Sequence, residues 1–229
     1  MEFIIIAIVT IVVTVILKII FDYNIKILKN IGKNEELDNL AKKYPSNIEI
    51  CKDYLKMLNN EKVKIEENKD SETSLYIAIT DKISIANISN TYTRIQTIAH
   101  ECLHSIQDRK VLLFNFIFSN IYIIYYFVIC ILEILNFLSY KMMFLNIFLI
   151  FSLAYYIVRA YLENDAMIKA RYLAKDYMFE KKYTTEQEIS KLVSGFDKIN
   201  KIGIKCINYN LFLGIMIKVL IFLAICIIR

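Results

Sequence analysis

The chain has few of the residues that build flexible linkers, disulfide frameworks or histidine clusters. It contains four glycines and one proline in 229 residues, and no Gly/Ser-rich linker, internal repeat or low-complexity block. Only two residues are histidine. The cysteines are odd in number and scattered: Cys51, Cys102, Cys130, Cys206 and Cys226. This distribution predicts reduced thiols and argues against a disulfide framework.

Hydrophobic residues are abundant instead. They make up 57% of the chain, with a mean hydropathy of +0.44, which excludes an ordinary soluble domain. Phe3 to Phe21 is an almost unbroken apolar run that is long enough to cross a bilayer. A secretory signal peptide does not fit, because the run follows the acidic Glu2, is too long, and lacks a small-residue cleavage site. Residues 1–21 are therefore predicted to form a transmembrane anchor.

Further apolar runs divide the rest of the chain. Residues 111–158 are predicted to hold two transmembrane helices joined by a short outer loop, and residues 209–229 a C-terminal transmembrane helix. Residues 22–110 and 159–208 are polar regions between these spans. Lys218 falls inside the last span, where we expect it to snorkel or to pair with a polar neighbour.

Basic residues close to the spans predict the orientation in the membrane. Nearly all of them flank the polar regions: Lys18, Lys26, Lys29, Arg109, Lys110, Arg159, Lys169, Arg171, Lys201 and Lys205. Only Lys141 and Arg229 lie on the other side. The positive-inside rule then puts both polar regions in the cytoplasm of a multi-pass cell-membrane protein, with both termini outside. Because this topology accounts for the net charge of +5, no nucleic-acid partner is inferred.

Local patterns in the first polar region predict a small α+β arrangement. Ser46 and Glu49 have capping-box spacing before a helix that runs to about Leu58. The other predicted elements are a helix at Glu35–Lys43, strands at Lys62–Glu66, Leu75–Thr80 and Ile83–Ile88, and a polar turn at Asn68–Thr73.

The stretch that predicts chemistry is an H-E-x-x-H pattern that holds both histidines of the chain. On a helix, His100 and His104 stand one turn apart on one face and can share a metal ion. Glu101 would lie beside that ion, where it could take a proton from a water molecule. The pattern is short and also occurs by chance in helices that bind nothing. Cys102 points to roughly the opposite side and is expected in the core.

The surroundings of the pattern favour a helix. Asn90 or Thr91 could serve as its N-cap. Its apolar face would consist of Ile95, Ile98, Ala99, Cys102, Leu103 and Ile106.

The predicted topology indicates where to look for a third ligand. Two spans separate His104 from Arg159, so the chain returns to the side that it left. Just beyond this return stand Glu163 and Asp165. Glu163 is the preferred third ligand, which leaves one zinc position for water, and Asp165 could support a histidine from the second shell. The alternative is a solvated helix start at the membrane surface.

Three segments together resemble one family, the YugP-like neutral zinc metallopeptidases of bacterial membranes. Ala99–Gln107 is similar to the family's A-H-E-x-G-H-x-I-Q, with Leu103 in place of its glycine. Glu163–Ala166 is similar to its E-x-D-A segment, and Tyr183–Glu188 to the acidic helix start before its last hydrophobic span. The resemblance covers nearly the whole chain and implies peptidase activity.

The sequence therefore predicts a mainly α membrane protein with about four transmembrane helices and a small α+β zincin-like cytoplasmic catalytic region. One Zn²⁺ per chain would be held by His100, His104 and Glu163, with Glu101 as the general base. The expected partners are the lipid bilayer and a peptide or protein substrate, membrane proteins included. An edge strand before the motif helix could pair with that substrate, and the alternative is an ordinary hairpin that supports the helix. Two alternatives stay open: an intramembrane metalloprotease and a non-catalytic scaffold stapled by zinc.

Overall fold

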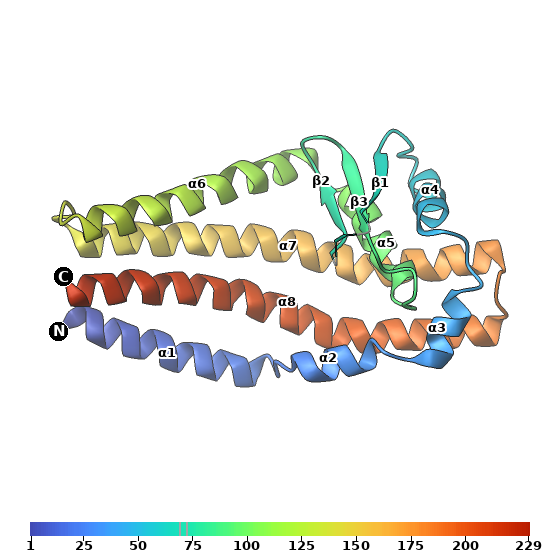
Figure 1. The fold of residues 1–229 in the computed structure, drawn as a ribbon, viewed down its shortest axis with the longest axis horizontal. Coiled ribbons are helices and arrows are strands. Elements are labelled where there is room, and N and C mark those ends of the chain that lie inside the picture. Colours follow the sequence, from blue (N-terminus) through green and yellow to red (C-terminus); the bar gives the residue numbers. More distant parts are fainter. Residues whose placement is uncertain (69, 72) are drawn as a thin grey trace. The chain divides into compact units, whose positions relative to one another are not determined.

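The computed structural model describes residues 1–68, 70–71 and 73–229, and these are mostly helical (Figure 1). The helices are α1 (Glu2–Ile20), α2 (Ile25–Ile31), α3 (Glu35–Ala41), α4 (Asn47–Met57), α5 (Arg94–His104), α6 (Arg109–Ile134), α7 (Lys141–Lys181) and α8 (Glu186–Ile228). The strands are β1 (Lys64–Asn68), β2 (Leu75–Ile77) and β3 (Lys82–Ala86). A mainly helical protein with a small sheet is therefore confirmed. The predicted turn at Asn68–Thr73 falls partly on Lys69 and Glu72, which lie outside the described residues.

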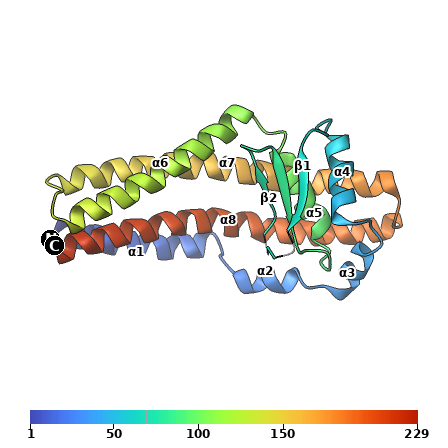
Figure 2. The ribbon, with the colours of Figure 1, turned by 45° about the horizontal axis from the view of Figure 1, so that its top comes forward.

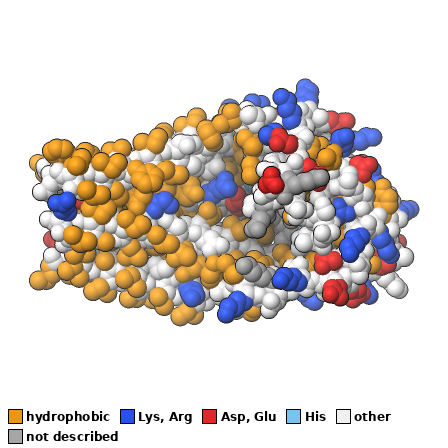
Figure 3. Space-filling view, in the orientation of Figure 1, with side chains coloured by type: hydrophobic (Ala, Val, Ile, Leu, Met, Phe, Trp, Pro, Cys, Tyr) orange, Lys and Arg blue, Asp and Glu red, His pale blue; other side chains and the backbone are white. Residues whose placement is uncertain are grey.

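Four helical stretches are long and apolar enough to cross a membrane: Glu2–Leu28, Arg109–Ile134, Lys141–Lys181 and Glu186–Ile228. Each of the four predicted transmembrane segments therefore falls in a helix of suitable length and composition. Figure 3 shows hydrophobic side chains gathered over the surface of these apolar helices. The last two helices are longer than predicted, with 41 and 43 residues, because no proline stops either of them where its hydropathy changes.

The chain divides into two compact units. Unit 1 comprises residues 1–23, 114–161 and 205–229, and unit 2 comprises residues 24–113 and 162–204. In unit 1 the buried Glu133 carboxylate forms an ion pair with Lys141, so its charge is compensated. Lys218 donates to the carbonyl of Gly214 at 3.1 Å, as expected for a lysine that pairs with a polar neighbour.

Unit 2 contains a three-stranded sheet with the order β1-β3-β2. Strand β1 is parallel to β3, with Ile65 beside Ile83, and β2 is antiparallel to β3, with Tyr76 beside Ile83. Both views show the sheet beside α5 (Figures 1 and 2). The strand just before the motif helix is therefore central, and the prediction that it offers a free edge is wrong. A strand that pairs on both sides has no free backbone groups, so the edges belong to β1 and β2.

Helices α4 and α5 form the core of unit 2 together with parts of α7 and α8. The predicted capping box is present, since the side chains of Ser46 and Glu49 bond each other's backbone at the start of α4. The predicted N-caps of α5 are wrong. The helix begins at Arg94, and the Thr91 hydroxyl instead donates to the Ile88 carbonyl at 3.1 Å. Of the predicted apolar face, Ile106 is exposed beyond the helix end, and the other members are buried.

Candidate metal centre

Helix α5 presents its two histidines on the side away from the core. Its apolar side chains Ile95, Ile98 and Cys102 are fully buried, at spacings of three and four residues. This burial fixes the rotation of the helix. His100 and His104 then lie on the opposite face, with side chains 17% and 12% exposed. The metal-binding face is thus set by the packing of the opposite face.

Helix α7 brings the third member of the group. Ala166, Ala170 and Ala174 follow one another at every fourth position and are buried in the same core as α5. Such small side chains let a helix backbone approach its neighbours closely. Glu163 stands one turn before Ala166, so its carboxylate lies on this inward face, with the side chain 14% exposed.

The three candidate ligand atoms converge. His104 Nε2 lies 3.1 Å from His100 Nε2, and Glu163 Oε2 lies 3.4 Å from His100 Nε2 and 3.8 Å from His104 Nε2. Tetrahedral zinc bonds of about 2.0–2.2 Å place ligand atoms roughly 3.3–3.6 Å apart. Two imidazole nitrogens and one carboxylate oxygen at these separations fit one ion with a position left over. Among the described residues, this group could hold a metal ion.

The charges around His104 favour a cation. Burial lowers the pKa of His104, but the hydrogen bond and charge of Glu163 and the charge of Glu101 outweigh it, so the pKa is raised. Two carboxylates therefore favour positive charge at the point where the imidazoles meet.

Glu101 lies beside this group and is itself buried, at 6% exposure. Burial raises the pKa of its carboxyl, while the nearby His100 and His104 and a backbone hydrogen bond from Tyr76 lower it, and the net shift is upward. Strand β2 thus contacts the one acidic side chain of the motif.

Gln107 links the end of α5 to α7. Its Oε1 atom lies 2.8 Å from His104 Nδ1. Its Nε2 atom donates to the carbonyl of Leu162 at 2.9 Å and to Asp165 Oδ2 at 3.1 Å. The other carboxylate oxygen of Asp165 pairs with Lys169 at 2.6 Å. Asp165 therefore contacts a glutamine that contacts His104, and the expected direct contact with a histidine is replaced by this chain.

The structure brings together the predicted ligands His100, His104 and Glu163, with Glu101 next to them. Cys102 is buried and 3.6 Å from the Cys51 sulfur, so it is a core residue as expected. Sequence reasoning missed the role of Gln107. Its position three residues after His104 was not a sufficient signal, because α5 ends at His104 and helical spacing does not extend to Gln107.

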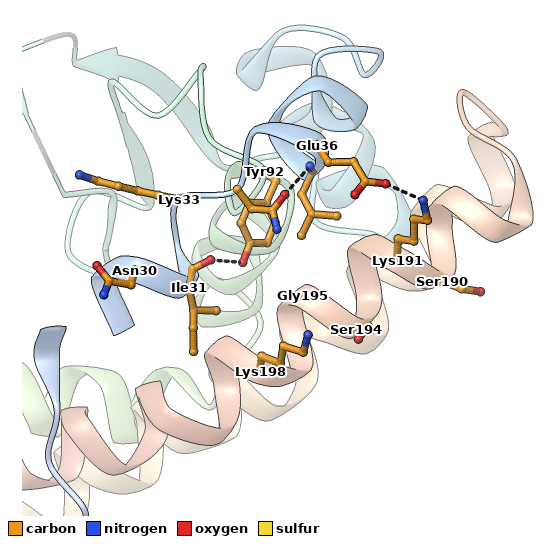
Figure 4. Close-up of a pocket in the computed structure, with 12 residues that line it drawn as sticks. Asn30, Ile31, Lys33, Glu36, Tyr92, Ser190, Lys191, Ser194, Gly195 and Lys198 are labelled. Carbon is orange, nitrogen blue, oxygen red and sulfur yellow. Dashed lines mark hydrogen bonds and ion pairs between the residues drawn. The ribbon is translucent and has the colours of Figure 1, made fainter. Parts of the chain in front are cut away.

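A separate hollow of about 540 Å³ in unit 2 does not share this chemistry (Figure 4). It lies between the α2–α3 segment and α8, and its lining includes Lys33, Lys198 and the ion pair of Lys191 with Glu36. No histidine or cysteine is among its lining residues. Its side chains give it no set of metal ligands.

Comparisons of the chain with protein-family models, with curated proteins and with solved structures gave no match. The resemblance to the YugP-like metallopeptidases therefore stays a prediction.

Proposed function

We propose that the chain is a membrane-anchored, zinc-dependent metallopeptidase whose site faces the cytoplasm. The observation that carries the proposal is the convergence of His100 Nε2, His104 Nε2 and Glu163 Oε2 beside a buried Glu101. Two histidines, one carboxylate and a neighbouring glutamate are the donor set and the base of a hydrolytic zinc site.

In this proposal, His100, His104 and Glu163 hold the ion. When bound, zinc would supply a Lewis acid that polarises the peptide carbonyl and acidifies a water molecule. Glu101 takes the proton of that water and then delivers it to the leaving amine. Its raised pKa suits the first step, because a carboxylate with a higher proton affinity is a stronger base.

Strand β2 is the best candidate to hold the substrate. Its one partner in the sheet is β3, and a hydrogen bond from the Tyr76 backbone reaches Glu101. An extended peptide that adds to this edge would run beside the general base. In this proposal, the substrate peptide pairs with β2 and not with the strand just before α5.

The rival intramembrane protease would carry its motif inside a membrane-spanning helix. Helix α5 has 11 residues and lies outside the four candidate spans. Its buried Arg94 donates to the carbonyl of Ala41, the last residue of α3, and to that of Tyr44 in the following turn. These features favour a site in the polar unit.

Metal content tests the proposed site. The protein would be purified in detergent, and bound metal measured by mass spectrometry for the wild type, His104→Ala and Glu163→Ala. We expect one zinc per chain in the wild type and little in either variant. Glu180→Ala is the matched control, since it removes an exposed carboxylate from the same helix. A zinc-free wild type, even after reconstitution, would contradict the proposal.

The Glu101→Gln variant tests the chemistry. It should keep its zinc and lose about 10²- to 10⁴-fold in the hydrolysis of a mixed peptide library, the usual worth of a general base. Cleavage products would be identified by mass spectrometry. Undiminished hydrolysis would reject the role of Glu101. The non-catalytic scaffold would be favoured if the wild type bound zinc but cleaved no peptide, and if the Glu101→Gln variant still functioned normally in cells.

A further inference from the structure

The amide of Gln107 is held at three points, and its partners fix which way it faces. Its nitrogen contacts the Leu162 carbonyl at 2.9 Å and Asp165 Oδ2 at 3.1 Å. A carbonyl oxygen only accepts hydrogen bonds, and so does an ionised carboxylate. Asp165 is ion-paired through its other oxygen with Lys169, at 2.6 Å. Both contacts therefore require the NH₂ group of Gln107 on the α7 side.

This orientation fixes the proton on His104. With its NH₂ group toward α7, Gln107 presents its carbonyl oxygen to His104 Nδ1, 2.8 Å away. An amide oxygen can only accept, so Nδ1 must carry the hydrogen. In the neutral ring, Nε2 then has no hydrogen and offers its lone pair. Nε2 is the atom that faces His100 and Glu163.

The turn after α5 holds Gln107 in place for this role. The Ser105 hydroxyl donates to the Cys102 carbonyl at 2.6 Å, and the Asn60 amide donates to the Ser105 carbonyl at 3.1 Å. The Gln107 backbone N–H donates to the His104 carbonyl at 3.3 Å. These contacts end the helix within one turn and bring the glutamine side chain back alongside the imidazole.

We propose that Gln107 and Asp165 are positioning residues that lock His104 in the Nδ1–H tautomer and so aim its Nε2 at the metal. Asp165 acts through Gln107 by holding the amide in the one orientation that can accept from the imidazole. The inference rests on the proposed metal site. Partners of this kind, outside the ligands themselves, typically change metal affinity by about 10- to 100-fold.

The tautomer can be measured without metal. Because the chain has two histidines, ¹⁵N-histidine labelling gives four ring-nitrogen signals in an NMR spectrum, and the His100→Ala variant assigns those of His104. At alkaline pH, we expect a hydrogen on His104 Nδ1 and none on Nε2. Gln107→Ala should release a mixture of both tautomers. Protonation on Nε2 in the otherwise unaltered protein would overturn the proposal.

Metal affinity tests whether Asp165 acts through Gln107. Zinc competition titrations should show a 10- to 100-fold loss for Gln107→Ala and for Asp165→Asn, and none for Asp176→Asn, an exposed carboxylate on the same helix. The Gln107→Ala/Asp165→Asn double variant should bind about as weakly as the weaker single variant. If the losses of zinc affinity in the two single variants added fully in the double variant, Asp165 would act by its charge alone. That result would overturn the proposal that it acts through Gln107.

The two proposals fail in different ways. Suppose that the wild type binds zinc and hydrolyses peptides, and that Gln107→Ala and Asp165→Asn bind zinc as tightly. This result would reject the positioning role of Gln107 and Asp165 and would leave the peptidase proposal unaffected. A wild type that binds no zinc would reject the metal site, while the metal-free NMR measurement would still decide whether Gln107 sets the tautomer.

Discussion

His104 experiences two opposed influences on its imidazole. Burial disfavours the charged ring, and the carboxylates of Glu163 and Glu101 favour it, with the result that the pKa of His104 lies above its ordinary value. A metal ion binds the neutral ring only. A metal ion at the proposed site would therefore compete with protons for the same nitrogen, and the outcome would depend on pH.

Zinc affinity should rise with pH and level off only above the ordinary histidine pKa of about 6.5. The reason is that His104 keeps its proton to a higher pH in the metal-free protein than a free histidine does. Competition titrations against a chelator over a pH series would measure this. A plateau reached below the ordinary histidine pKa would contradict the expectation.

The same shift affects folding without metal. A raised folded-state pKa means that protonated His104 adds stability below its unfolded pKa and that this contribution disappears as pH rises through the folded pKa. Metal binding gains strength over the same range. The gap between the unfolding temperatures of metal-bound and metal-free protein should therefore widen toward alkaline pH.

Some residues of the candidate site could be predicted from the sequence, and others could not. His100 and His104 follow from their spacing on a helix, and Glu163 follows from the topology that returns the chain to one side. Gln107 does not, because its contacts depend on the tight turn after α5 and on the rotation of α7. Neither of these is encoded in a local spacing.

Helix α8 passes close to the first polar region at a residue without a side chain. A Cβ atom on Gly195 would lie 2.8 Å from Leu37 Cδ1 and 2.9 Å from Tyr92 Cε2. The Tyr92 ring cannot easily move away, because its hydroxyl donates to the Ile31 carbonyl at 2.9 Å (Figure 4). Its face also stacks on Phe196. The close packing of these elements requires glycine here.

Gly195→Ala should therefore destabilise the protein, even though alanine favours helices. Overpacking of a filled contact costs about 1–3 kcal/mol, which exceeds the helix propensity gain of about 1 kcal/mol. Thermal unfolding in detergent would show the loss as a lower unfolding temperature. Ser194→Ala, at the exposed neighbouring position, is the control. A Gly195→Ala variant as stable as this control would show that Leu37 moves aside.

Elements with strong local signals were predicted well. The capping box fixed the start of α4, and the apolar runs located all four candidate spans. Strand order was not predictable, because the pairing of β1 with β3 in parallel depends on contacts distant in sequence. The full length of α7 was missed for a different reason: a change in hydropathy does not end a helix that contains no breaker.

The whole polar unit should depend on the metal. The ligands come from α5 and α7, two elements far apart in the chain, so an ion that binds them favours the folded state alone. At a free zinc concentration of about 1,000 times its Kd, the gain is about 4 kcal/mol. Chelation should lower the unfolding temperature of the wild type and leave His104→Ala unchanged. Equal responses from both proteins would contradict the prediction.

The orientation of the molecule gives a further test. Single cysteines placed at Tyr140, before α7, and at Lys182, after α7, mark the two ends of that helix. In intact cells, a membrane-impermeant maleimide should label the first position only, because the positive-inside rule puts the second in the cytoplasm. The native cysteines are buried and should add little background. Labelling at Lys182 and not at Tyr140 would reverse the topology.

Helix α7 runs without interruption from Lys141 to Lys181 and carries Glu163 on the way. Glu163 comes 22 residues after Lys141 in this helix, and about 20 helical residues cross a bilayer's hydrocarbon core. In the proposed topology, the candidate ligand would therefore come just after the membrane-crossing part of the helix. For the proposed peptidase, a substrate anchored in the same membrane would then be tethered near the site, at an effective concentration on the order of millimolar. Weak intrinsic recognition would then suffice for cleavage, and selectivity would come from where a substrate resides.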